Sequence, residues 1–212
     1  MQNDNIKIIF FGDIVGKSGR HAVRDFLLQN KSNYDFIIAN VENASHGFGL
    51  TEKNYNELSE YGVDCMTSGN HIWDKKEIFT YIDSADKLLR PINYPKGTHG
   101  IGSKIFEIDD TKIAVINILG KVFINAVDFQ FEMLTDEIKR LKEITPIVII
   151  DFHAEATAEK ICFARYISEF GVSAFFGTHT HVQTADENII NGMAYITEAN
   201  ECHPDFLKEQ KQ

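Results

Sequence analysis

The sequence predicts an α/β fold, with two packed sheets or one mixed sheet flanked by helices. Three observations lead to this prediction. Short apolar runs alternate along the chain with segments of helical pattern. Runs such as Ile8–Phe11 and Ile147–Ile150 are apolar at every position, which is typical of strands buried on both faces of a layered sheet. No repeat, low-complexity tract or Pro/Ser-rich linker interrupts the 212 residues, so we expect one domain over residues 1–212.

Each apolar run predicts one strand of this fold. In chain order the runs are Ile6–Phe11, Asp35–Val41, Val63–Thr67, Lys112–Leu119, Pro146–Phe152, Ser173–Gly177 and Met193–Thr197. The segment Lys104–Ile108 precedes one of them and is joined to it through Asp109, Asp110 and Thr111, which predicts a hairpin.

The segments between the runs predict helices. Their positions are near residues 17–30, 51–61, 74–83, 128–143 and 157–170. Thr51 is a suitable N-cap for the second helix, with Glu52 in its first turn.

The composition excludes several classes of function. The net charge is -10, from 21 Lys and Arg against 31 Asp and Glu, and an acidic surface repels phosphate backbones, so strong nucleic-acid binding is not expected. The 3 cysteines show no C-x-x-C spacing, which favours a reducing cytoplasm. No signal-peptide pattern or apolar run of ~20 residues is present, so we expect a cytoplasmic protein without membrane contact.

Polar residues gather where the apolar runs end. Five strand ends supply the set Asp13, Glu42, Asn43, Asn70, His71, His153, His179 and His181. Ligands of α/β sheets bind at the carboxyl ends of strands, so we expect these side chains at one rim. Carboxylates, amides and imidazoles together suit Fe, Mn or Zn. The set is too large for one tetrahedral ion and matches two ions that share a bridge, as in sites that activate water against a phosphoryl group.

Several of these residues also allow plainer interpretations. Asp13 could be a turn residue, Glu42–Asn43 could be a helix-entry or loop pair, and an isolated histidine such as His153 is more often a satisfied core residue. The pair His179-x-His181 would present both imidazoles on one side of an extended segment, since side chains alternate there; its alternative is solvated surface. The combination in one order at strand ends favours the metal hypothesis.

Two further residues are weaker candidates. Gly16-Lys17-Ser18 resembles the end of a phosphate-binding loop, but the required earlier glycine is replaced by Phe11, so NTP hydrolysis is disfavoured. Lys17 remains a candidate for contacting substrate phosphate, with a solvated face as the alternative. His46 follows Glu42–Asn43 closely and either lines the pocket or is an ordinary loop residue.

The order of these motifs resembles the calcineurin-like metallophosphoesterase superfamily, and more closely its bacterial YmdB-type phosphodiesterases. The resemblance rests on the segments FFGDIVGKSGR, NVENASHGFGLT, TSGNHIWDKKEI, LLRPINYP, IDFHAEATAEK and FGTHTHVQTADE. The superfamily's usual Asp-x-His opening is absent, because Asp13 is followed by Ile14 and Val15; this difference is typical of the YmdB-type branch. The resemblance implies a four-layer α/β/β/α sandwich.

The resemblance also implies roles for the site residues. The metal ligands would be Asp13, Glu42, Asn43, Asn70, His153, His179 and His181. Asp13 and His181 would hold one ion and Asn70, His153 and His179 the other, with Glu42 as the bridge. Fe and Mn are the expected ions, with Zn and Mg as alternatives. His71 would stabilise the transition state or protonate the leaving oxygen while a bridging hydroxide attacks phosphorus.

The expected activity is therefore hydrolysis of a small-molecule phosphodiester, such as a 2′,3′- or 3′,5′-cyclic nucleotide. Family members usually continue beyond Tyr195–Thr197 with an Asp-x-Gly-Met-Thr-Gly-Pro-like segment, whereas this chain has Glu198 and ends at Gln212, so the resemblance implies a shortened C-terminus. It also suggests a homo-oligomer. The alternatives are a non-catalytic regulatory or RNA-associated factor with a structural metal site, or an inactive truncated paralogue. An amidohydrolase is disfavoured, because amidohydrolases carry a His-x-His on their first strand, whereas the His-x-His of this chain follows a late strand.

Overall fold

The computed structural model describes residues 6–124, 127, 131–199 and 201–202, and two sheets form its centre. The first sheet is parallel and runs, in spatial order, β1 (Ile8–Phe11), β2 (Phe36–Asn40) and β3 (Cys65–Thr67). The second sheet is mixed and runs β4 (Ser103–Ile108), β5 (Thr111–Leu119), β6 (Ile147–His153), β7 (Ala174–Thr178), β9 (Met193–Ile196) and β8 (Asn188–Ile190).

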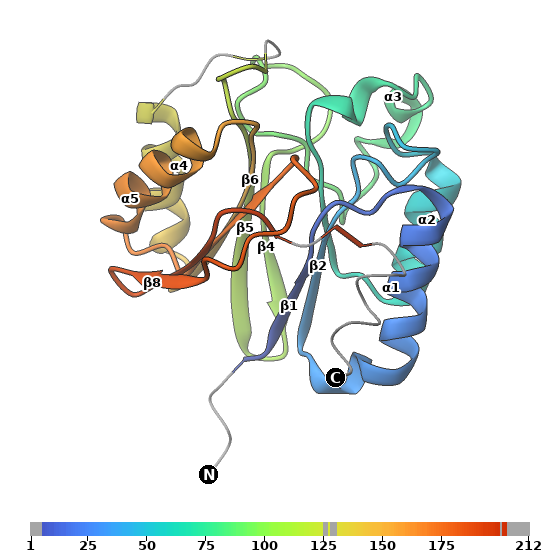
Figure 1. Ribbon diagram of the computed structural model, residues 1–212, viewed down its shortest axis with the longest axis horizontal. Coiled ribbons are helices and arrows are strands. Elements are labelled where there is room, and N and C mark those ends of the chain that lie inside the picture. Colours follow the sequence, from blue (N-terminus) through green and yellow to red (C-terminus); the bar gives the residue numbers. More distant parts are fainter. Residues whose placement is uncertain (1–5, 125–126, 128–130, 200, 203–212) are drawn as a thin grey trace.

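Helices cover the outer face of each sheet (Figure 1). The helices on the side of the first sheet are α1 (Gly16–Asn30), α2 (Glu52–Tyr61) and α3 (Ile78–Tyr81), and those on the side of the second are α4 (Phe131–Lys142) and α5 (Thr157–Ser168). Short 3-10 turns occur at Lys31–Asn33 and Asn70–Trp73. The predicted α/β/β/α sandwich is therefore confirmed.

Side chains of the buried strand β2 alternate between two hydrophobic clusters, one between the sheets and one under the helices. Phe36 and Ile38 of β2 pack in one cluster with Val115 and Ile149 of the second sheet, so they lie between the sheets. Their neighbour Ile37 belongs instead to the cluster that includes residues of α1. Side chains of a strand point alternately to its two faces, and every residue of β2 is apolar up to its last, Asn40, because both faces are covered.

Most predicted elements are present, with two differences. Thr51 caps α2 as predicted, accepting a 3.3 Å hydrogen bond from the Asn54 amide. The predicted helix at 74–83 is wrong in extent, since only Ile78–Tyr81 is α-helical. Residues 128–130 of another predicted helix lie outside the described residues.

The second difference is an edge strand that the sequence analysis missed. Strand β8 pairs antiparallel with β9 across the dipeptide Asn191–Gly192. Both residues have positive φ, 49° and 84°, as a tight hairpin turn requires. The Asn-Gly dipeptide was the signal that could have predicted this hairpin. Within the described residues, no helix has the length and apolar character needed to cross a bilayer.

Gly177 on β7 gives a stability prediction. A Cβ built at Gly177 would lie 1.8 Å from the Thr197 carbonyl oxygen and 3.0 Å from Lys160 Cδ. We expect Gly177→Ala to lower the free energy of unfolding, measured in urea, by about 3 kcal/mol, because the backbone at Thr197, just after the neighbouring strand β9, would have to shift. Gly192→Ala is the control, since its φ is 84° but nothing lies within 4 Å; it should cost about 1 kcal/mol. Equal losses would contradict the packing argument.

Candidate functional site

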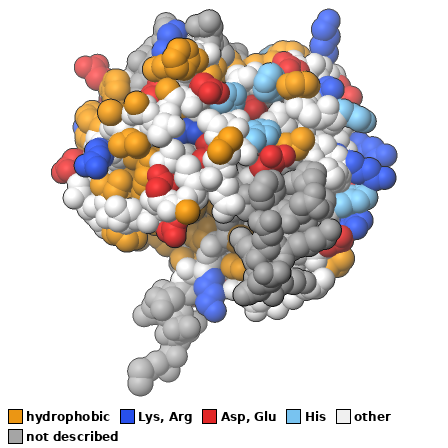
Figure 2. Space-filling view, in the orientation of Figure 1, with side chains coloured by type: hydrophobic (Ala, Val, Ile, Leu, Met, Phe, Trp, Pro, Cys, Tyr) orange, Lys and Arg blue, Asp and Glu red, His pale blue; other side chains and the backbone are white. Residues whose placement is uncertain are grey.

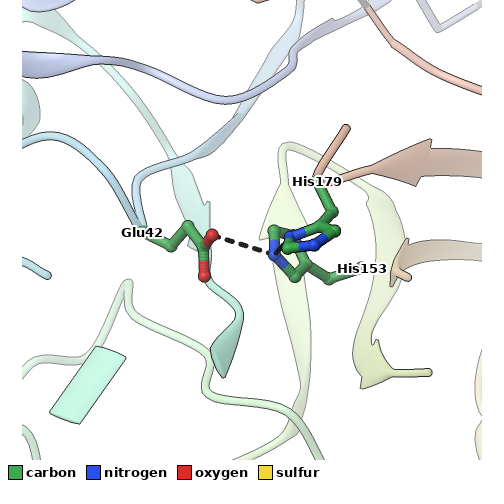
Figure 3. A group of neighbouring side chains, drawn as sticks. All are labelled: Glu42, His153 and His179. Atoms are coloured by element: carbon green, nitrogen blue, oxygen red, sulfur yellow. Dashed lines mark hydrogen bonds and ion pairs between the residues drawn. The ribbon is translucent and has the colours of Figure 1, made fainter. Parts of the chain in front are cut away.

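The carboxyl ends of strands from both sheets bring the predicted ligands to one rim. Glu42 follows β2, His153 ends β6, and His179 follows β7. Figure 3 shows these three side chains directed toward one another. Glu42 Oε1 lies 2.9 Å from His153 Nε2, and His179 Nδ1 lies 3.0 Å from the same nitrogen. The three form a group whose ligand atoms are all within 4.8 Å of one another.

Three more predicted residues extend this group. Asn43 Nδ2 lies 3.4 Å from Glu42 Oε1 and 3.0 Å from His181 Nε2. Asp13 Oδ1 lies 3.7 Å from His181 Nε2 and 3.9 Å from His153 Nδ1. Six of the seven predicted ligands thus form one continuous cluster, and Figure 2 shows histidine side chains beside carboxylates on this face of the molecule.

The two residues that flank Asn70 in the sequence, Gly69 and His71, both contact the cluster. Gly69 is so close that a Cβ there would meet Glu42 Oε2 at 2.2 Å and His153 Cδ2 at 2.3 Å. The amide of His71 donates to Glu42 Oε2 over 3.2 Å. Asn70 stands between these two contacts. The backbone at 69–71 is therefore held against the carboxylate and imidazole of the cluster.

Two buried oxygens of this site test whether it fits metal ions. Asp13 Oδ1 and Asn70 Oδ1 have no hydrogen-bond partner among the described residues. A buried polar atom without a partner is costly, and such atoms need an explanation such as an ion. Both are oxygen atoms that can coordinate a metal ion together with imidazole nitrogens. The donor set therefore fits the metal ions that the sequence predicted.

A buried hydrogen-bond chain sets the orientation of His153. Thr178 Oγ1 donates to Asp151 Oδ1 over 2.7 Å and lies 3.0 Å from His153 Nδ1. Because the hydroxyl proton goes to the carboxylate, Thr178 accepts from the His153 Nδ1–H. Asn40 and Thr67 donate to Asp151 Oδ2. The chain fixes the proton on His153 Nδ1, so Nε2, which faces Glu42 and His179, is the atom that would bind a metal ion.

The electrostatics of the cluster are dominated by burial and by His153. Burial alone would raise the pKa of Glu42, but the charge and hydrogen bond of His153 lower it to about 2. Burial would lower the pKa of His153, and Glu42 raises it to about 9. Burial and then His153 lower the pKa of His179 to about 4. Burial raises the pKa of Asp13. Without metal, His153 therefore holds a proton that a cation would displace.

His71 lies beside the cluster in the 3-10 turn Asn70–Trp73. Its Nδ1 lies 2.8 Å from Asp74 Oδ2, and its side chain is 31% exposed. Its ring contacts the exposed ring of Phe48 at a centroid distance of 4.8 Å. The Asp74 carboxylate fixes the Nδ1 proton, so Nε2 is the atom of His71 that is available to a ligand.

The His-x-His segment reaches the cluster by a different route from the one predicted. The expectation of an extended backbone is wrong: β7 ends at Thr178, and His179 and His181 have φ angles of 107° and 60°. Both imidazoles face the cluster because the backbone turns there. Lys17 and His46 are exposed, so their predicted contacts with substrate remain predictions.

Sequence reasoning also missed several residues around the ligands. They are Asn40, Asp74, Glu155, Glu198 and Glu201. Glu155 Oε2 lies 2.9 Å from His179 Nε2, and Glu201 Oε2 lies 3.6 Å from His181 Nδ1. Asn40 was detectable as a polar residue ending the apolar strand β2. The others had no local signal.

Known proteins resemble this chain over most of its length. A curated relative from Bacillus subtilis (strain 168), named 2′,3′-cyclic-nucleotide 2′-phosphodiesterase, is 45% identical over 202 residues, which cover 94% of this chain and 76% of the relative. A solved structure described as a novel phosphatase, from Mycoplasma pneumoniae, has a TM-score of 0.82 and 40% identity, covering 92% of this chain and 72% of the other.

A second solved structure, a hypothetical protein from Thermus thermophilus, has a TM-score of 0.86 and 36% identity, with coverage of 92% and 77%. The family described as YmdB-like protein matches residues 9–205. The match spans both sheets and every residue of the cluster described above. On the strength of that match and of the B. subtilis relative, the chain belongs to the YmdB-like family.

Proposed function

We propose that this protein is a phosphodiesterase that uses two metal ions to hydrolyse cyclic nucleotides. The observation that carries the proposal is the cluster of six predicted ligands with the unpartnered oxygens of Asp13 and Asn70. The name of the B. subtilis relative supports the reaction class and suggests 2′,3′-cyclic nucleotides as substrates.

We assign the ligands to two groups around Glu42. Asp13, Asn43 and His181 would hold one ion, and Asn70, His153 and His179 the other. Glu42 suits the shared position because its Oε1 lies 3.4 Å from the Asn43 amide on one side and 2.9 Å from His153 on the other. We expect Fe or Mn, with Zn or Mg as alternatives. When bound, the ions would activate water and neutralise the phosphate oxygens.

The chain's own residues supply the remaining steps. His71 would donate the proton from Nε2 to the leaving oxygen of the sugar, while Asp74 holds Nδ1 and stabilises the charged ring. The hydrogen-bond chain through Thr178 and Asp151 would keep His153 in the tautomer that binds an ion. Opening the ester at the 2′ oxygen of a 2′,3′-cyclic nucleotide would leave a 3′-phosphate.

Metal analysis with an activity assay tests this proposal. Protein purified without chelator should contain about two equivalents of Fe or Mn by elemental analysis. It should hydrolyse bis-p-nitrophenyl phosphate with added Mn²⁺, and then 2′,3′-cyclic nucleotides. We expect Asn70→Ala to lose the activity and part of the metal, because it removes the unpartnered oxygen.

Asn93→Ala is the matched control for Asn70→Ala. Asn93 is also buried, but it bonds both the carbonyl and the amide of Leu119, at 2.8 and 3.0 Å. Its loss should lower stability and leave metal content unchanged. Bound metal without turnover in the wild-type protein would favour a regulatory factor or an inactive paralogue. Absence of metal would refute the proposed centre.

Three expectations accompany this proposal. We propose one domain over residues 1–212, a cytoplasmic location and the homo-oligomer that the family resemblance suggests. Gel filtration with light scattering would measure the oligomeric state directly. The substrate is proposed to be a small molecule, since the charge of -10 opposes binding to a nucleic-acid backbone.

A further inference from the structure

The loop that carries His179 and His181 has a strained backbone. The φ angles of these residues are 107° and 60°, in the left-handed region that residues other than glycine rarely adopt. Such strain persists only where the surroundings fix the conformation. The loop therefore needs partners that hold it in place.

Glu198 supplies these partners from the end of the second sheet. Its Oε1 accepts hydrogen bonds from the amides of Thr180, at 2.8 Å, and of His181, at 3.2 Å. Its backbone amide donates to Thr184 Oγ1 over 3.0 Å, and its carbonyl accepts from the Thr184 amide over 3.4 Å. Glu198 thus binds the loop at its turn and again three residues beyond His181.

Lys160 of α5 completes the arrangement. Its Nζ forms an ion pair with Glu198 Oε2, and both side chains are only 1% exposed. A buried ion pair contributes little net stability, because both charges lose their hydration. A charged carboxylate does, however, accept shorter and stronger hydrogen bonds than a neutral group. The pair therefore fits a role in holding the loop better than a role in overall stability.

We propose that Lys160 and Glu198 are positioning residues that hold the His179–His181 loop in its metal-binding conformation before any ion arrives. The carboxylate accepts from backbone amides of the segment that carries the two imidazoles, and the ion pair with Lys160 orients that carboxylate. This inference rests on the proposed metal centre. Loss of such supporting contacts typically weakens metal affinity by roughly 10- to 100-fold.

Two double variants separate the hydrogen bonds from the charge. Lys160→Met/Glu198→Ala removes the acceptor of the loop amides without leaving a buried lysine unpaired. Lys160→Met/Glu198→Gln keeps a carbonyl oxygen in the same place and removes both charges. Leu141→Ala is the control for simple destabilisation, since Leu141 is fully buried in the core on the side of α4 and α5.

The first readout is the dissociation constant for Mn²⁺, measured by competition with a chelating dye. We expect the alanine double variant to bind more weakly by roughly 10- to 100-fold. The glutamine double variant should recover most of the affinity, and Leu141→Ala should keep it. Wild-type affinity in the alanine variant would overturn the proposal, as would equal losses in the two double variants.

The second readout works without any metal. In chelator-treated protein, the amides of Thr180 and His181 should exchange hydrogen faster in the alanine variant than in the glutamine variant, because only the latter retains their acceptor. Equal exchange in the two variants would overturn the proposal. A wild-type protein that binds no Mn²⁺ would refute the metal centre alone, since amide exchange still tests how the loop is held.

Discussion

His71→Ala is expected to lower kcat by roughly 10²- to 10⁴-fold while both metal ions stay bound, because a positioned general acid contributes that much to catalysis. His71 donates only its backbone amide to Glu42, over 3.2 Å, and alanine keeps that amide. The measurement is kcat with a 2′,3′-cyclic nucleotide, combined with elemental analysis of the same sample. Asp74→Asn should lower kcat less, since it weakens only the hydrogen bond to His71 Nδ1.

His99→Ala is the matched control for this prediction. His99 also pairs through Nδ1 with a carboxylate, at 2.6 Å from Asp83 Oδ2, and its side chain is 54% exposed. It lies outside the cluster of proposed ligands, so its removal should leave both kcat and metal content unchanged. If His71→Ala lost metal and turnover together, His71 would be a ligand and its role as an acid would be wrong.

The metal-free protein is expected to lose stability as the pH rises from about 6.5 to about 9. Glu42 raises the pKa of the buried His153 from 6.5 to about 9. Because the pKa of His153 is raised in the folded state, its protonation stabilises the fold fully below pH 6.5, and this stabilisation is lost above about pH 9. The loss amounts to about 3 kcal/mol, since one pKa unit corresponds to about 1.4 kcal/mol. Urea unfolding in the presence of a chelator, repeated across this range, measures it.

The two groups in contact with His153 Nε2 each keep one charge state in this pH window. Glu42, with its pKa at about 2, stays ionised throughout, and His179, with its pKa at about 4, stays neutral in the folded protein. His153→Gln should flatten the dependence between pH 6.5 and 9, because it removes the titrating group. Metal affinity should change in the opposite direction and rise with pH, since binding displaces the His153 proton. A flat profile in the metal-free wild-type protein would show that His153 is not held protonated.

The sequence predicts most of this site because its residues follow strand ends. Apolar runs locate the strands, and Asp13, Glu42 and His153 come at or just after their ends. Parallel pairing then brings those ends to one rim. A layered α/β fold is predictable because the apolar runs of strands such as β2 and β6 need cover on each side, whereas the four-layer order came from the family resemblance.

Contacts between segments far apart in the sequence could not be predicted. Nothing local to Glu198 indicates that its carboxylate accepts the amides of Thr180 and His181. The positive φ angles of the two histidines likewise have no local signal in the sequence. Residues 74–77 form bends and turns, so α3 covers only Ile78–Tyr81, and residue preferences alone do not show this.

The separation of the ligands along the chain has a consequence for how a cell could load this protein. Asp13 is synthesised well before His179 and His181, which come from the other sheet. At the usual pace of translation, roughly 10 to 30 s pass between them. Until then the growing chain offers only part of the cluster. In the proposed metal centre, an ion would find the full ligand set only after synthesis of the second sheet, so the centre would be filled on the folded chain and not during translation.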